Sequence, residues 1–286
     1  MVMNRSMTPT VALFVPGNRP ERFDKALASG ADAVILDLED AVADEHKPSA
    51  RALVAEFVRR HPQVIVRVNA RATIWFDEDL AALSTTSVAA VMLPKAESAA
   101  DVAAVRSRMR ATTRVLPLIE SARGLRNLEQ ILACDGVWCA GFGSLDYALD
   151  LACAHSWDAL LLARSQLVLH SKLAGLPPPI DGVTAALDQS ALVEHEARQA
   201  AQLGFGGKLA IHPRQLRPIR KGFQPDAATL AWAQAVIAAS ETGDAAQLGG
   251  AMVDRPVLER AKRVLVQVQR TTNENCPASS TDAGGC

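Results

Sequence analysis

Pro117-Leu118-Ile119-Glu120-Ser121-Ala122-Arg123-Gly124 is the stretch of this 286-residue chain that best indicates its fold. The residues from Val115 to Ile119 are compatible with a buried strand, and they lead directly into the acidic Glu120. Ser121 has the residue type of a helix N-cap, and leucines at helical spacing follow it. This order of strand, acid and helix predicts a carboxylate that is exposed at one rim of a sheet or barrel.

A second acid, Asp146, follows the next apolar stretch, and we expect it on a glycine-rich loop, Gly141-Phe142-Gly143-Ser144-Leu145-Asp146. Two acids at the ends of successive strands could share one hard cation. Mg²⁺ takes one or two protein carboxylates and leaves its other positions to water and substrate. The alternative from these residues alone is that Glu120 pairs with an arginine and that Asp146 caps a helix.

Composition and charge exclude several classes of protein. Hydrophobic residues make up 49% of the chain, and the net charge of −1 comes without a basic block that would indicate nucleic-acid binding. The chain has no apolar run of membrane-spanning length, and its polar N-terminus does not resemble a signal peptide, so we expect a cytoplasmic protein. We expect Cys134, Cys139 and Cys153 to be reduced and buried, and Cys276 and Cys286 to lie in a mobile tail.

Eight strand signals alternate with helix signals. They lie at residues 11–15, 33–38, 64–68, 89–93, 115–119, 137–140, 179–181 and 207–211. Continuous apolar strands of this kind indicate a parallel sheet covered on both faces, and eight such units favour a (β/α)8 TIM barrel over an open sheet. Polar residues follow most of these strands, where such barrels carry their chemistry: Glu39, Arg67, Lys95, Glu120, Asp146, Asp181 and His212.

The domain organisation follows from the same pattern. We expect residues 1–222 to form the barrel and residues 223–270 to add C-terminal helices and an interface segment. Residues 271–286 are polar, small and rich in glycine and proline, so we expect a disordered tail. The helices expected around and after the strands are 20–29, 48–60, 76–83, 99–109, 157–174, 190–203, 225–240 and 254–268.

Several polar residues have both a functional and a structural interpretation. The fork of Arg67 matches a substrate carboxylate, but it equally matches an ion pair with Glu39 or Asp37 that closes the barrel. Lys95 has the residue type of a Schiff-base lysine, which its sequence context does not support. His212 precedes a proline at a strand-to-helix turn, where a hydrogen-bonded structural role is the more common one.

The chain also contains six ordered segments within residues 11–268 that match one family pattern: Leu13–Arg22, Leu36–Val42, Arg67–Asn69, Leu93–Glu97, Leu118–Ser121 and Gly207–Pro213. These segments resemble the citrate lyase beta-subunit-like branch of the HpcH/HpaI aldolase/citrate lyase family, and in particular its stand-alone acyl-CoA lyases. The resemblance implies a (β/α)8 barrel, usually a homotrimer, with Mg²⁺ and often an acyl-CoA substrate.

The resemblance also implies roles for individual residues. Glu120 and Asp146 match the metal ligands of the family, and Arg67 matches the arginine that binds the substrate carboxylate. Glu39 matches an acid near the metal and its waters. The approach to Asp146 departs from the family pattern, because Gly143-Ser144-Leu145 stands where an Ala-Glu-Asp-like sequence is common, and this leaves the substrate preference open.

Two further regions complete the expected site. The segment Gly250–Pro256 resembles the C-terminal segment of the acyl-CoA lyases, whose aspartate, here Asp254, reaches the active site of a neighbouring subunit. The alternative is that Asp254 only caps a helix. For the nucleotide of CoA, we expect contacts from Arg19, in the turn after the first strand, and from Lys208.

The function that the resemblance implies is reversible cleavage of a carbon–carbon bond in a 3-hydroxyacyl-CoA of the citryl-, malyl- or citramalyl-CoA type. The products would be acetyl-CoA and a 2-oxo acid. Mg²⁺ would stabilise the developing alkoxide, and Arg67 would orient the carboxylate. Two alternatives stay open, namely a metal-dependent aldolase that acts on free 2-oxo acids and a non-catalytic subunit of a larger lyase complex.

Overall fold

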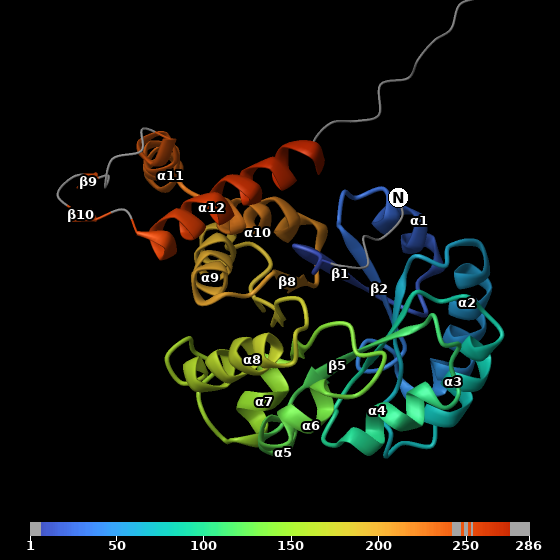
Figure 1. Ribbon diagram of the computed structural model, residues 1–286. Helices are drawn as coiled ribbons and strands as arrows, with labels where there is room; N and C mark the ends of the chain where they lie inside the picture. Colours follow the sequence, from blue (N-terminus) through green and yellow to red (C-terminus); the bar gives the residue numbers. More distant parts are fainter. Residues whose placement is uncertain (1–6, 242–246, 249–250, 253, 275–286) are drawn as a thin grey trace, which may run out of the picture. The chain divides into compact units, whose positions relative to one another are not determined.

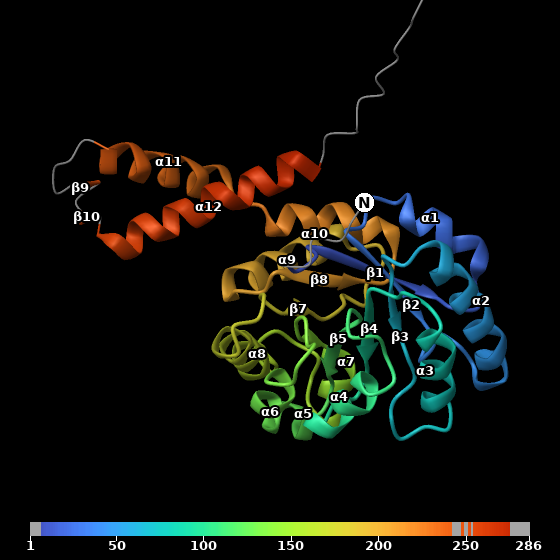
Figure 2. The same cartoon turned by 45° about the vertical axis from the view of Figure 1, so that its right-hand side comes forward.

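The computed structural model describes residues 7–241, 247–248, 251–252 and 254–274. Its internal contacts divide the chain into two units, residues 1–223 and 224–286. The first unit is a barrel of parallel strands surrounded by helices, as Figure 1 and Figure 2 show. Within the described residues, no helix combines the length and the apolar character that a membrane span requires.

The eight strands of the barrel pair in sequence order, and β1 closes the barrel by pairing with β8. The strands are β1 (Val11–Pro16), β2 (Ala33–Asp37), β3 (Ile65–Arg67), β4 (Ala90–Leu93), β5 (Arg114–Ile119), β6 (Gly141–Phe142), β7 (Ile180–Asp181) and β8 (Gly207–Ala210). This topology confirms the (β/α)8 barrel that the sequence predicts. Strand pairing is shortest between β6 and β7, where a single residue pair, Gly141 and Ile180, joins the two strands.

Helices cover the outside of the barrel. They are η1 (Pro20–Arg22), α1 (Phe23–Leu27), η2 (Asp44–His46), α2 (Lys47–Arg60), α3 (Phe76–Ser84), α4 (Ala99–Arg106), α5 (Ala122–Arg126), α6 (Leu128–Leu132), α7 (Ser144–Asp150), α8 (Leu161–Leu173), α9 (Ser190–Leu203), η3 (Pro213–Gln215) and α10 (Leu216–Phe223). Ser121 caps α5 by accepting a hydrogen bond from the N–H of Gly124, as its position in the sequence predicts.

The strands contribute to two separate cores because successive side chains of a strand point to opposite faces. In β2, Val34 and Leu36 belong to the layer between strands and helices, whereas Ile35 belongs to the layer inside the barrel. Ile65 and Met92 extend the inner layer from β3 and β4. Both layers are closed to water, which explains why the strands lack an apolar–polar alternation.

The structure differs from the sequence prediction at the sixth strand. The predicted residues 137–140 are buried, but their contact with β5 is a single bridge between Val115 and Val137, and β6 begins only at Gly141. The glycine-rich stretch that followed was expected to be a loop, and it contains β6 and the start of α7. The apolar run of residues 137–140 therefore indicates burial and not regular pairing with a neighbouring strand.

The cysteine prediction is correct in part. Cys134, Cys139 and Cys153 are free thiols, but Cys139 alone of these three is fully buried, while the other two are partly exposed. Cys276 and Cys286 lie outside the described residues.

The second unit contains α11 (Ala227–Glu241), β9 (Gln247–Leu248), β10 (Ala251–Met252) and α12 (Arg255–Glu274). Ala233 and Val236 of α11 pack with Ala261 of α12 in a small apolar cluster of their own. The helix α12 continues to Glu274, beyond the expected end at residue 268, and residues 275–286 of the expected tail lie outside the described part of the chain.

Candidate active site

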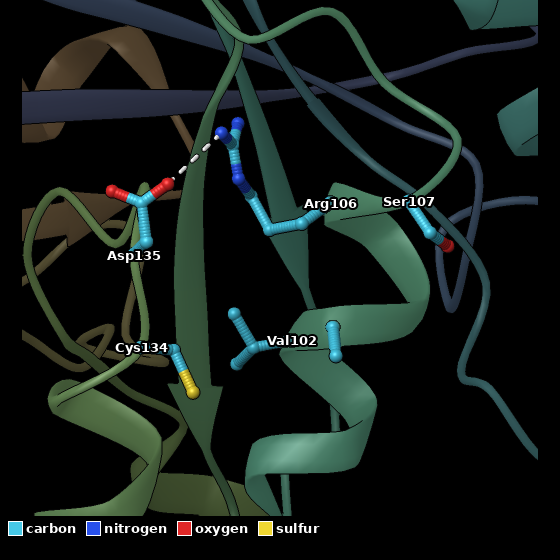
Figure 3. A pocket seen from close by; sticks show the side chains of 6 residues that line it. Val102, Arg106, Ser107, Cys134 and Asp135 are labelled. Carbon is cyan, nitrogen blue, oxygen red and sulfur yellow. Dashed lines mark hydrogen bonds and ion pairs between the residues drawn. The ribbon is translucent and has the colours of Figure 1, made fainter.

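One surface hollow lies away from the predicted site. Its lining residues come from α4 and from the turn that follows α6: Val102, Ala103, Arg106, Ser107, Cys134 and Asp135 (Figure 3). Arg106 donates a hydrogen bond of 2.7 Å from Nη1 to the carbonyl oxygen of Thr113, which immediately precedes β5. The hollow therefore lies toward the amino ends of the strands, and the chemistry of a (β/α)8 barrel lies at the carboxyl ends.

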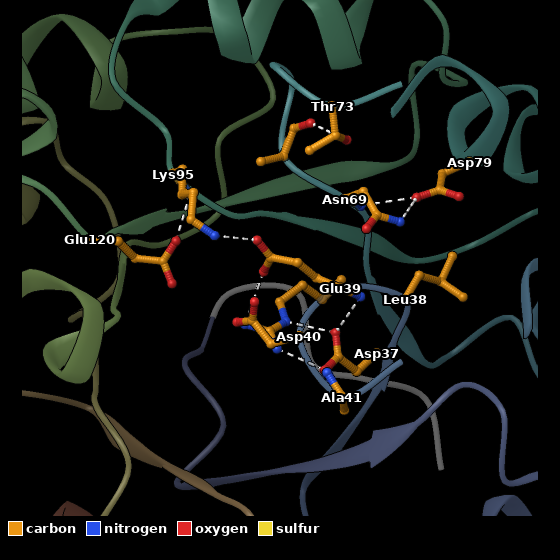
Figure 4. A network of polar contacts seen from close by, with 12 residues as sticks. Asp37, Leu38, Glu39, Asp40, Ala41, Asn69, Thr73, Asp79, Lys95 and Glu120 are labelled. Carbon is orange, nitrogen blue, oxygen red and sulfur yellow. Dashed lines mark hydrogen bonds and ion pairs between the residues drawn. The ribbon is translucent and has the colours of Figure 1, made fainter. Parts of the chain in front are cut away.

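The carboxyl ends of four neighbouring strands bring the predicted polar residues together. Asp37 ends β2, Arg67 ends β3, Lys95 follows β4 and Glu120 follows β5. Because these strands are parallel and adjacent, their last side chains meet at one rim of the barrel. Figure 4 shows Glu39, from the segment after β2, between Asp37 and Lys95.

Arg67 forms a bidentate ion pair with Asp37. Its Nε and Nη2 atoms each lie 2.7 Å from a carboxylate oxygen of Asp37, and both side chains are buried. Asp37 also accepts hydrogen bonds from the backbone N–H groups of Glu39 (2.9 Å) and Ala41 (3.1 Å). The structural alternative for Arg67 is thus realised, and its remaining nitrogen, Nη1, lies 3.1 Å from Oε2 of Glu39.

Glu39 lies between two cationic groups. Nζ of Lys95 donates a hydrogen bond of 2.6 Å to Oε1, while the buried Oε2 faces Nη1 of Arg67 and forms no hydrogen bond within the described residues. Burial raises the pKa of Glu39 above its usual value, although the charges of Arg67 and Lys95 act in the opposite direction. A carboxylate with such a pKa can exchange a proton nearer to neutral pH than an exposed one.

Glu120 is a buried carboxylate that is held by the backbone. Its Oε2 accepts a hydrogen bond of 2.6 Å from the backbone N–H of Lys95. Burial is the main cause that raises the pKa of Glu120, to about 8, and the negative charges of Glu39 and Asp146 add to it. Glu39 and Asp146 therefore each lie close enough to Glu120 to repel its charge.

Asp146 lies in the first turn of α7 and is partly exposed. The turn that precedes it passes tightly over Glu120, because a Cβ atom at Gly143 would lie 2.2 Å from Cγ of Glu120. The backbone angle φ of Gly143 is −85°, which any residue adopts, so close approach explains the glycine rather than backbone freedom.

The Glu120 and Asp146 carboxylates fit a hard divalent cation. Neither forms an ion pair with a cationic side chain in the part of the chain that the structure describes. That part also contains no group of three or more acidic, histidine or cysteine side chains that could hold a metal. Two carboxylates that repel each other, with other positions left to water and substrate, match the ligand preference of Mg²⁺.

Lys208 does not fit the role of a CoA contact. Its side chain is fully buried, and Nζ lies 3.1 Å from Asp181 and 3.4 Å from Glu196. Arg164 completes this cluster with a hydrogen bond of 2.9 Å from Nε to Asp181. In β8, Leu209 belongs to the layer inside the barrel, so the alternation of the strand points Lys208 to the opposite face, toward α8 and α9. Two acids compensate its charge there, so we assign it to this buried cluster between the strands and the helices.

The other expected residues lie at separate places. Arg19 is exposed in the turn after β1, where its backbone N–H donates to the carbonyl of Pro16 at 3.1 Å. His212 accepts a hydrogen bond of 3.1 Å at Nδ1 from the backbone N–H of Arg214, which indicates a structural role. Asp254 belongs to the second unit, and its Oδ1 accepts a hydrogen bond of 3.1 Å from the N–H of Val257 as the cap of α12.

A supporting set of residues escaped the sequence analysis. The buried Nζ of Lys47 donates to the backbone carbonyls of Leu38 and Glu39, both at 3.0 Å, and to Oδ1 of Asn69 at 2.7 Å. Asp79 accepts from the backbone and the side chain of Asn69. These bonds fix the backbone beneath Glu39. A lysine directly before a helix-opening proline gives no sequence signal of burial.

Comparisons with known proteins find a family model and relatives that match most of the chain. The family model of HpcH/HpaI aldolase/citrate lyase matches residues 10–213. A citrate lyase subunit beta-like protein of Mycobacterium tuberculosis is 38% identical over 270 residues, which cover 92% of this chain and 96% of that protein. A (3S)-malyl-CoA thioesterase of Cereibacter sphaeroides is 34% identical over 256 residues, which cover 86% of this chain and 88% of that protein.

Solved structures agree with the sequence relatives. The crystal structure of CitE from Mycobacterium tuberculosis in complex with magnesium, acetoacetate and coenzyme A superposes with a TM-score of 0.84 and 37% identity. The match covers 93% of this chain and 99% of that one.

Proposed function

The chain belongs to the HpcH/HpaI aldolase/citrate lyase family, and we propose that it is a Mg²⁺-dependent lyase that acts on a 3-hydroxyacyl-CoA. The substrate would be of the citryl-, malyl- or citramalyl-CoA type, and the products would be acetyl-CoA and a 2-oxo acid. The observation that carries this proposal is the pair of carboxylates, Glu120 and Asp146, neither of which has a cationic ion-pair partner among the described residues, with Arg67 and Glu39 close to Glu120.

Glu120 and Asp146 would hold the metal ion. When bound, Mg²⁺ acts as a Lewis acid that stabilises the negative charge that develops on the hydroxyl oxygen of the substrate. The chain fixes Glu120 through the backbone N–H of Lys95 and through the close passage of Gly143, so the carboxylate is oriented before the ion arrives.

Arg67 would bind the substrate carboxylate through the edge of its guanidinium group that Asp37 leaves free. Asp37 holds Nε and Nη2, which fixes the plane of the group. Nη1 lies beside Glu39 and donates a hydrogen bond of 3.3 Å to the exposed Asp40, which the substrate carboxylate would replace. Such a contact orients the scissile bond relative to the catalytic groups, and orientation of this kind contributes several kcal/mol to catalysis, on the order of 10³-fold or more in rate.

Proton transfer would involve Glu39 and Asp254. Glu39, with its raised pKa, would accept the proton of the 3-hydroxyl group as the carbon–carbon bond breaks and the hydroxyl carbon becomes a carbonyl. The electron pair of the broken bond passes to the thioester as an enolate, and Asp254 would supply the proton that converts its carbon into the methyl group of acetyl-CoA. We propose that Asp254 comes from a neighbouring subunit of a homotrimer, and that Arg19 contacts the nucleotide of CoA.

A second candidate is hydrolysis of the thioester, which the similarity to a (3S)-malyl-CoA thioesterase favours. Water would then attack the thioester carbonyl, and the products would be free CoA and the intact hydroxy acid. The two reactions differ in their products, because cleavage of the carbon–carbon bond releases a 2-oxo acid and leaves the thioester intact.

The experiment is an assay of the purified full-length protein with Mg²⁺ and a panel of citryl-, malyl- and citramalyl-CoA, with acetyl-CoA, free thiol and 2-oxo acid all quantified. We expect acetyl-CoA and 2-oxo acid in equal amounts, and no product when EDTA removes the metal. Free thiol without 2-oxo acid would identify the hydrolase. Cleavage of free acids alone would identify the aldolase, and no turnover of any substrate would favour a non-catalytic subunit.

A further inference from the structure

Lys95 joins the two acids that have different proposed roles. Its backbone N–H donates a hydrogen bond of 2.6 Å to Glu120, and its Nζ donates another of 2.6 Å to Glu39. Figure 4 shows the side chain lying between the two carboxylates. One residue therefore fixes a proposed metal ligand with its backbone and a proposed proton acceptor with its side chain.

The backbone of Lys95 is strained. Its φ of 48° lies in the left-handed region, which residues with a Cβ atom rarely adopt and which glycine adopts readily. Glycine would present the same backbone N–H to Glu120 without this strain. The lysine side chain must therefore be explained by what its ammonium group does, and that group donates its hydrogen bond to Glu39.

The ammonium group determines where the Glu39 carboxylate lies. Oε1 is bound to Nζ of Lys95, whereas Oε2 is buried beside Arg67 and forms no hydrogen bond within the described residues. Without the ammonium group, Oε1 would lose its hydrogen bond while Oε2 kept only the contact with Arg67, and an unsatisfied oxygen of a buried carboxylate is costly. A metal ion at Glu120 would be the nearest replacement, because Lys95 bridges the two carboxylates.

We propose that Lys95 is a positioning residue that keeps Glu39 out of the coordination shell of the metal. This inference rests on the proposed Mg²⁺ site at Glu120 and Asp146. Mg²⁺ has near-octahedral coordination, so a third protein carboxylate would bind the ion more tightly and would occupy a position that the substrate needs. Lys95 thus lowers the affinity for the metal ion, but it leaves a coordination position open for the substrate and keeps Glu39 available to the substrate hydroxyl.

The test measures Mg²⁺ binding to the substrate-free protein by calorimetry. Lys95→Met removes the ammonium group but keeps the backbone N–H that holds Glu120. We expect its Kd for Mg²⁺ to fall about tenfold, which corresponds to roughly 1.4 kcal/mol, while kcat falls. The conservative Lys95→Arg should stay near the parent Kd. The double variant Lys95→Met/Glu39→Gln should return to the parent Kd, because the carboxylate that would otherwise join the metal ligands is gone.

Lys95→Gly provides a second variant on a backbone that prefers the left-handed conformation. We expect it to melt at a higher temperature than Lys95→Met and to show the same tighter Mg²⁺ binding. If the parent protein binds Mg²⁺ and neither Lys95→Met nor Lys95→Gly binds it more tightly, the proposed role of Lys95 is overturned, while the proposed metal site stands. A parent protein that does not bind Mg²⁺ would overturn the proposed metal site and this inference together.

Discussion

Asp37 holds the guanidinium group of Arg67 through two hydrogen bonds of 2.7 Å. The fork that matches a carboxylate is therefore occupied by a carboxylate of the protein itself. The remaining nitrogen, Nη1, lies beside Glu39 and donates a hydrogen bond of 3.3 Å to the exposed Asp40, which a substrate carboxylate would have to replace. Arg67 thus has a structural and a functional contact at once, and the two can be separated by experiment.

Replacement of Arg67 by lysine is expected to lower both stability and activity. Lysine keeps the charge but loses the planar pair of N–H groups toward Asp37 and the contact made by Nη1. We expect a loss of about 1–3 kcal/mol in the free energy of unfolding. We also expect kcat/KM to fall by about 100-fold or more, as urea titration and steady-state kinetics would measure.

The matched variant is Asp37→Asn, which breaks the same ion pair but leaves Nη1 in place. We expect a similar loss of stability and a much smaller loss of kcat/KM than in Arg67→Lys. If the two variants lost kcat/KM equally, the effect of Arg67 on activity would come only from its structural ion pair with Asp37 and not from a contact with the substrate.

Stability should depend on pH through Glu120. Its folded-state pKa of about 8 lies above the usual value of 4.5, so the folded protein holds a proton that the unfolded chain releases between these values. The resulting stabilisation is complete below pH 4.5 and is lost as the pH rises toward 8. Mg²⁺ binds the ionised carboxylate, so we expect the Mg²⁺-induced rise in Tm to be larger at pH 8.5 than at pH 6.

Thermal melts with EDTA or Mg²⁺ across this pH range would measure the effect. Glu120→Gln, which has a neutral side chain of the same shape, should lose both this pH dependence and the response to Mg²⁺. Parent protein with the same Mg²⁺-induced shift at both pH values would count against the assignment.

Gly143→Ala is expected to impair metal binding. The added Cβ would lie 2.2 Å from Cγ of Glu120 and 2.6 Å from its Oε1, so the carboxylate or the turn before Asp146 must move. We expect Mg²⁺ affinity to fall about tenfold or more by calorimetry, with a folded protein by circular dichroism. Gly175→Ala is the control, because a Cβ there meets no atom within 4 Å and its φ of 68° makes the substitution strained.

Gly175 lies between α8 and β7, at the amino end of that strand, so its substitution should cost about 1–2 kcal/mol of stability without changing Mg²⁺ affinity. Unchanged Mg²⁺ affinity in Gly143→Ala would place the metal away from Glu120.

The proposed role of Asp254 requires a variant that preserves its cap. Oδ1 of Asp254 accepts the N–H of Val257, and asparagine can accept the same bond, so Asp254→Asn should keep α12 capped while it removes the acid. We expect Asp254→Asn to lose most of kcat with a nearly unchanged Tm. If the aspartate acts between subunits, mixing this variant with Glu120→Ala should restore part of the activity after subunit exchange.

The control for this mixture is Glu120→Ala mixed with Asp146→Ala, which leaves every metal pair incomplete and should stay inactive. Demonstrated exchange without recovery in the first mixture would place Asp254 in its own subunit's site or outside catalysis.

Sequence reasoning predicted the barrel because eight continuous apolar runs of strand length alternate with helix signals along the chain, and this pattern can be read without knowledge of tertiary contacts. It failed at β6, where residues 137–140 are buried without regular pairing and the strand forms at Gly141. Gly141 and Gly143 looked like a loop, but both are close-approach positions against side chains of β5 and Glu120. A buried segment and a paired strand both appear in the sequence as an apolar run, and only the pairing register in the structure distinguishes them.

The candidate site could be predicted by residue type but not by partner. Strand order placed Glu39, Arg67 and Glu120 at one rim, whereas the choice of Asp37 as the partner of Arg67 depends on the register between β2 and β3. Lys208 was misassigned for a similar reason. A lysine near a strand end gives the same pattern whether it points out to solvent or is buried between the barrel wall and the helices, where Asp181 and Glu196 lie beside it.

The short strands β6 and β7 have a consequence for local opening. They pair through Gly141 and Ile180, so few main-chain hydrogen bonds join this part of the wall. The β1–β2 side is joined over five residue pairs, from Ala12 to Pro16. Backbone amides of β6 and β7 should therefore exchange with deuterium faster than those of β1 and β2. Since β6 leads into the turn that carries Asp146, the rim beside the proposed metal would be the first part of the barrel to open locally.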